Sequence, residues 1–170
     1  ELVGMEYFSR IGRYDVVDAW KEFWPQSGSS QHWDGWAVVR FKDGTEEILI
    51  VEAKANSPEI ETPGTGSKGA GRAKILSVLD KTKAFLNVPI DAVWHKIYYQ
   101  FCNRLATLYF LNEKVEEPSR LLMIYFVGDK FPDERDCPQS QDAWKPHVSQ
   151  MHQAIKLPRD HRYSARVIDV

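Results

Sequence analysis

The stretch from Trp33 to Lys54 constrains the fold more than any other part of the chain. It contains two apolar runs separated by Lys42-Asp43-Gly44-Thr45. The Asp-Gly pair tolerates the positive φ angles of a tight hairpin turn. The stretch therefore predicts two antiparallel strands whose outer ends meet.

Three ionisable residues stand at those outer ends: Asp34 on one strand, and Glu52 and Lys54 on the other. Because side chains alternate along a strand, Glu52 and Lys54 leave the same face. The apolar run before them indicates a buried strand, where a Glu and a Lys are costly unless paired, hydrated or metal-bound. An edge-strand ion pair without catalytic meaning is the alternative.

Two converging carboxylates form a hard oxygen site for Mg²⁺ or Mn²⁺. Such a metal lowers the pKa of its bound water and neutralises charge on a phosphate in the transition state. An adjacent lysine can hold the attacking hydroxide. The residue types therefore point to metal-assisted hydrolysis of a phosphodiester.

At these residues the chain resembles the PD-(D/E)xK nuclease family, which has the restriction-endonuclease-like fold. Asp34 matches the family's metal aspartate, Glu52 its glutamate and Lys54 its lysine, whereas Trp33 replaces the proline before the aspartate. The resemblance is close in the hairpin and looser over the rest of the chain from about Tyr14.

The resemblance implies a Mg²⁺ (or Mn²⁺) cofactor held by Asp34, Glu52 and the backbone carbonyl of Ala53. It implies nucleic acid, with DNA expected, as the partner, and it leaves a homodimer open as the assembly. In RecB-like branches of the family a later helix presents a Gln and, four residues on, an aromatic. Here Gln100 keeps the first position and Arg104 takes the second, so the two could reach the site together. Backbone capping or a solvent-facing position is the alternative for both.

Composition favours one compact domain over residues 1–170, because 43% of the 170 residues are hydrophobic and 27% are charged. No apolar run is long enough for a membrane span. Cys102 and Cys137 have no metal-ligand spacing and suit a reducing cytosol, so we expect a cytoplasmic protein.

A net charge of −2 argues against nucleic-acid binding by bulk electrostatics, but phosphate contacts are local. Lys68, Arg72 and His32 are candidate substrate contacts, and ordinary solvated positions are the alternative. Basic residues gather in two places: Lys68, Arg72, Lys74, Lys81 and Lys83, and then Lys156, Arg159, His161, Arg162 and Arg166.

An amphipathic pattern predicts a helix over 14–24. Glu22 in this helix is the candidate for an additional acid, which family members often place on a first helix, although its position on the polar side favours solvent. The Gly-rich segment at about 56–71 predicts a flexible loop beside the catalytic strand, and a substrate-covering flap is a reasonable role for it.

Further patterns predict helices over 72–86, 91–111 and 144–157. A near-continuous apolar run over 119–128 suits a strand buried on both faces, reached by a parallel or mixed crossover, and 165–170 suits a last short strand. This order is that of a restriction-endonuclease-like αβα sandwich, an α/β fold with a central mixed sheet.

The function expected from these features is that of a metal-dependent phosphodiester hydrolase, a DNA endonuclease, with Asp34, Glu52, Lys54 and Gln100 as catalytic residues. Two other classes stay open. One is a catalytically silent nuclease-fold module for DNA binding or assembly. The other is an unrelated α/β protein in which Glu52 and Lys54 form a surface pair.

Overall fold

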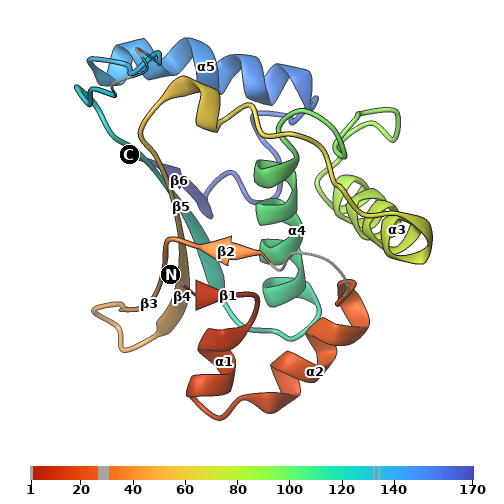
Figure 1. Ribbon diagram of the computed structural model, residues 1–170. Helices are drawn as coiled ribbons and strands as arrows, with labels where there is room; N and C mark the ends of the chain where they lie inside the picture. The colour runs from red at the N-terminus through yellow and green to blue at the C-terminus, as the bar shows by residue number, and fades with distance from the viewer. Residues whose placement is uncertain (1, 27–30, 132, 134) are drawn as a thin grey trace.

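The centre of the protein is a four-stranded mixed sheet with helices packed against it (Figure 1). The computed structural model describes residues 2–26, 31–131, 133 and 135–170. Its elements are, in order, β1 (Leu2–Val3), α1 (Glu6–Arg10), α2 (Tyr14–Phe23), β2 (His32–Trp33), β3 (Gly35–Arg40), β4 (Glu46–Lys54), the 3₁₀ turn η1 (Ser57–Glu59), α3 (Gly69–Phe85), α4 (Tyr99–Glu113), β5 (Ser119–Tyr125), α5 (Gln141–Ala154) and β6 (Val167–Asp169).

The predicted hairpin is confirmed as β3 and β4, which pair antiparallel with Gly35 opposite Val51. Gly44 has a φ of +87° in the turn, as the Asp-Gly pair predicts. The crossover prediction is also confirmed, because β5 runs parallel to β4 and β6 runs parallel to β5. The strand order β3-β4-β5-β6 makes β4 an inner strand.

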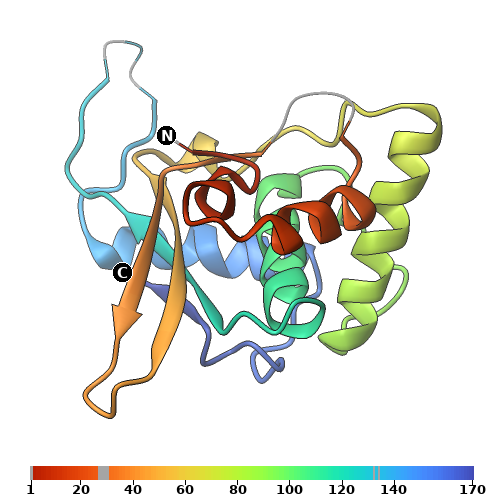
Figure 2. The ribbon, with the colours of Figure 1, turned by 90° about the horizontal axis from the view of Figure 1, so that it is seen from below.

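The described helices lie on one side of this sheet, which Figure 2 shows most clearly. The inward residues of β4 and β5 are buried, as Ile50 and Leu121 illustrate, whereas Val51 and Leu122 on the opposite face are only half-buried. The expectation that 119–128 is buried on both faces is therefore wrong. The strand's apolar run reflects one buried face and one half-covered face.

The helix expected over 91–111 begins eight residues later, at Tyr99. Tyr98 adopts a left-handed conformation with φ +64°, which interrupts a right-handed helix at that point. Upstream, the buried indole of Trp94 donates to the backbone carbonyl of Ile155 at 2.8 Å and ties that segment to the end of α5. Because apolar residues recur at helical spacing across the whole range 91–111, the sequence pattern did not show that residues 91–98 form a loop and not a helix.

Other boundaries shift by a few residues. The loop expected at 56–71 is shorter than predicted. Helix α3 already begins at Gly69, and residues Ser57–Glu59 form the 3₁₀ turn η1. Ser140 caps the start of α5 by accepting from the backbone N–H of Ala143 at 3.2 Å. Among the described residues, no helix is both long and apolar enough to cross a membrane.

Candidate active site

Strand β4 carries Glu52 and Lys54 into the interior. Its burial alternates, and both residues continue the inward row of Ile48 and Ile50. Glu52 is 3% exposed and Lys54 is 7% exposed, and the Lys54 Nζ donates to Glu52 Oε1 at 2.5 Å. The ion pair is therefore real, but it lies inside an inner strand and not on the surface or on a sheet edge.

Asp34 lies between β2 and β3, one position beyond the Gly35–Val51 pair, so the hairpin register brings it level with Glu52. Its Oδ2 accepts the backbone N–H of Ala53 at 2.7 Å. The hairpin thus brings Asp34 to β4, as expected from the turn. The Asp34 side chain is exposed, however, and the bond that fixes it goes to the strand backbone.

Helix α4 supplies the next two members of the site. Gln100 Oε1 accepts from Lys54 Nζ at 2.6 Å, and the Arg104 Nε donates to Glu52 Oε2 at 2.8 Å. Every residue from Phe101 to Leu111 is buried. Gln100, Asn103, Arg104 and Thr107 form the polar stripe of this helix. Arg104 is buried, and Gln100 is half-buried with its amide oxygen on Lys54, so neither side chain simply faces solvent.

Arg104 is the most constrained side chain in the cluster. Besides Glu52, it donates from Nη2 to the His32 carbonyl at 2.6 Å and from Nη1 to Asn103 Oδ1 at 2.9 Å. Its guanidinium lies 4.2 Å from the ring centre of Trp33. Trp33, directly before Asp34, therefore offers an aromatic face against which the Arg104 guanidinium packs.

A groove of about 730 Å³ opens beside this cluster. Gln100 and Arg104 border both the groove and a cavity of about 10 Å³ that is lined by Glu52 and Lys54. They therefore stand between the groove and the buried ion pair. Other residues that line the groove are His32, Lys68, Tyr99, Trp24, Thr65 and Gly66.

The segment 60–68 forms one wall of the groove and is tied to the start of α4. Thr62 Oγ1 accepts the backbone N–H of Gln100 at 3.0 Å, and the Thr65 N–H donates to the His95 carbonyl at 3.2 Å. A Cβ at Gly64 would lie 2.4 Å from that same carbonyl oxygen, so only glycine allows this approach. Movement of this segment as a flap stays a prediction.

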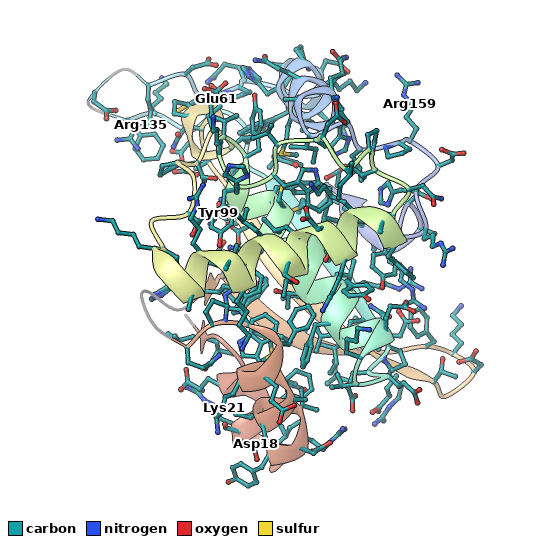
Figure 3. The ribbon with its side chains drawn as sticks, turned by 90° about the vertical axis from the view of Figure 1, so that its right-hand side faces the viewer. Asp18, Lys21, Glu61, Tyr99, Arg135 and Arg159 are labelled. Atoms are coloured by element: carbon teal, nitrogen blue, oxygen red, sulfur yellow. The ribbon has the colours of Figure 1, made fainter. Side chains whose placement is uncertain are left out.

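Two tyrosines beside the site remain protonated at neutral pH. Burial is the main cause that raises the pKa of Tyr99 in the groove and of Tyr125 beside the small cavity. Both can therefore donate a hydrogen bond from an uncharged phenol. Figure 3 shows Tyr99 near the first turn of α3, below the segment that carries Glu61.

The other predicted residues lie at different distances from this centre. His32 and Lys68 line the groove, as a substrate-contact role requires. Arg72 lies in the first turn of α3, acts electrostatically on His95 and is not among the residues that line the groove. Glu22 is exposed on α2 beside Lys74 and Lys81, in a separate hollow. Its role as an additional acid finds no support in this position.

The two gatherings of basic residues do not form simple patches. Lys83 is buried and donates to the carbonyls of Ile90 and Ala92, which gives it a structural role. His161 is buried and its pKa is lowered mainly by that burial, so it adds no positive charge at neutral pH. Lys68 is the member of these gatherings that lines the groove.

Sequence reasoning gave no site role to three residues that shape this region: Asn103, Thr62 and Trp33. Asn103 holds the Arg104 guanidinium, and it belongs to the same polar stripe as Gln100 and Arg104. That stripe was the available signal for it. Thr62 and Trp33 act through contacts across 38 and 71 residues, which local patterns do not reveal.

The donor types suit a hard divalent cation, since Asp34 and Glu52 are carboxylates and Ala53, next to Glu52 on β4, offers a backbone carbonyl. Yet the described residues contain no group of three acidic, His or Cys side chains arranged to hold a metal. Both Glu52 oxygens are bound by cationic side chains. A metal would therefore require a side chain to move.

Comparison with known proteins finds no family model that matches the chain, no matching curated protein and no matching solved structure.

Proposed function

We propose that this protein is a metal-dependent phosphodiester hydrolase of the PD-(D/E)xK type that acts on DNA. The observation that supports the proposal is the continuous chain of bonds from Gln100 through Lys54 and Glu52 to Arg104, whose two ends border a groove. The family resemblance selects Gln100, Lys54 and Glu52, whereas Arg104 stands where RecB-like members have an aromatic. The four residues come from β4 and α4, which are far apart in sequence.

In this proposal Asp34, Glu52 and the Ala53 carbonyl would hold Mg²⁺ or Mn²⁺, which lowers the pKa of a bound water. Lys54 holds the nucleophilic water and shields phosphate charge, and Gln100 fixes the Lys54 ammonium through its amide oxygen. His32 and Lys68 contact the substrate backbone from the groove. A restriction-endonuclease-like fold belongs to the same proposal. The described helices cover one face of the sheet, whereas an αβα sandwich covers both.

Cleavage of plasmid and single-stranded DNA with Mg²⁺ or Mn²⁺ tests the proposal. We expect Glu52→Gln and Lys54→Ala each to lower the cleavage rate by roughly 10²-fold or more, because each removes a group that acts on the reacting phosphate. Lys42→Ala is the matched control, since Lys42 is exposed in the hairpin turn. Equal cleavage by wild type and both site variants would identify a contaminant and remove the claim.

A second candidate is a catalytically silent module of the same fold that binds DNA or supports an assembly. The observation that favours it is the Glu52 carboxylate, whose two oxygens are both satisfied by Lys54 and Arg104. DNA binding, DNA cleavage and calorimetric metal titration of the same protein distinguish the two candidates. Binding of DNA without cleavage in either metal, and with no heat on metal titration, would support the silent module.

A further inference from the structure

The cluster around Glu52 already contains its own cations. Lys54 Nζ lies 2.5 Å from Glu52 Oε1, and Arg104 Nη2 lies 2.7 Å from Glu52 Oε2. All three side chains are less than 10% exposed. A divalent ion that approaches Glu52 must therefore compete with the Lys54 ammonium and the Arg104 guanidinium in a region that water screens poorly.

The charge balance of this interior opposes a third cation. Glu52, Lys54 and Arg104 are the charged residues that line the small cavity, so one carboxylate faces two positive groups. The cavity holds about 10 Å³, about the size of one water molecule. A hydrated metal ion cannot enter unless one cation leaves and creates both space and negative charge.

Of the two cations, Arg104 has open space beside it into which its side chain can move. It borders the groove as well as the small cavity, whereas Lys54 borders only the cavity. Its guanidinium is suited to phosphate, which it can bind through two parallel N–H donors. Lys54, in contrast, is held within the interior by Gln100.

We propose that Arg104 is a resident counter-cation of Glu52 that competes with the divalent metal and moves toward the groove when the metal binds. This inference rests on the proposed function and adds a way in which metal binding at Glu52 is regulated. In the metal-free protein Arg104 fixes and neutralises Glu52. Metal binding in the absence of substrate is weak because it must break the contacts of Arg104 with Glu52 and the His32 carbonyl.

Mn²⁺ binding without DNA tests this competition, with free Mn²⁺ measured by electron paramagnetic resonance in wild type and in Arg104→Met. We expect the variant to bind Mn²⁺ on the order of tenfold more tightly, because Glu52 loses its competing cation. Arg120→Met is the matched control. Arg120 on β5 pairs with Glu47, which lies on β4 like Glu52 but outside the site. Its affinity for Mn²⁺ should equal that of wild type.

The outcomes separate the inference from the function on which it rests. Bound Mn²⁺ with equal or weaker affinity in a folded Arg104→Met variant overturns the inference alone. No Mn²⁺ binding by any variant overturns the proposed function and the inference together. If Arg104→Met does not fold, Arg104→Gln decides, because its amide removes the positive charge and still offers a hydrogen-bond donor to this interior. Its affinity should exceed that of wild type, and an unchanged affinity overturns the inference.

Discussion

At the scale of single residues, Asp34 combines a structural and a proposed chemical role. Its Oδ2 accepts the Ala53 N–H at the position just before β3 begins, so the side chain replaces a backbone partner. The proposed function requires the same carboxylate as a metal ligand. Two substitutions separate these roles, because an amide oxygen keeps the hydrogen bond but is a much poorer metal ligand.

We expect Asp34→Ala to lower the free energy of unfolding by about 1 kcal/mol, because the Ala53 N–H loses its acceptor. Asp34→Asn should lower it less, and both variants should lose cleavage to a similar extent. Urea denaturation beside the cleavage assay measures the two effects. An Asp34→Asn variant that is stable and fully active would exclude a role of this carboxylate in catalysis.

At the scale of elements, the site depends on β4, α4 and the segment 60–68. This segment leads from β4 toward α3 and contacts the start of α4 beside the groove. Strand alternation and the Asp-Gly turn made β4 predictable. The interior direction of the α4 polar stripe was predicted only beside a solvent-facing alternative, because a polar stripe on a helix normally faces water. It faces inward here since Glu52 and Lys54 offer charged partners to Gln100 and Arg104.

The contact at Gly64 gives a prediction for this segment. Gly64→Ala would place a methyl group 2.4 Å from the His95 carbonyl oxygen, so the segment must move and break the Thr65 N–H bond to that carbonyl. We expect a loss of about 1–3 kcal/mol in unfolding free energy and faster hydrogen exchange at the Thr65 amide.

Gly66→Ala is the control for that prediction, since no atom lies within 4 Å of a Cβ at Gly66. Its stability and its Thr65 amide exchange should stay close to those of wild type. If the two variants behave alike, the wall of the groove is not held by the close approach at Gly64.

At the scale of the whole molecule, the half-buried His152 and the buried His161 link stability to pH. His152 on α5 packs 5.5 Å from the ring of Phe101, and burial lowers its pKa. Burial also lowers the pKa of His161. The folded protein therefore binds fewer protons than the unfolded chain near the ordinary histidine pKa of about 6.5, and stability falls as the pH drops through that window.

Unfolding free energies at pH 7.5 and 5.5 test this linkage. Wild type should lose stability on acidification, by at most about 1.4 kcal/mol per pH unit for each histidine. His152→Phe removes one of these groups and keeps an aromatic ring beside Phe101, so its loss should be smaller. An identical pH dependence in wild type and variant would show that His152 is not the source.

The sequence by itself determined the hairpin, the inward pairing of Glu52 with Lys54 and the approximate helices, because turn chemistry and periodicity act over a few residues. Only the tertiary structure decided that Arg104 binds Glu52 across 52 residues, that Trp94 ties the segment before α4 to the end of α5, and that the described helices cover one face of the sheet. Such contacts depend on how elements pack around a shared core, and no local pattern specifies that packing.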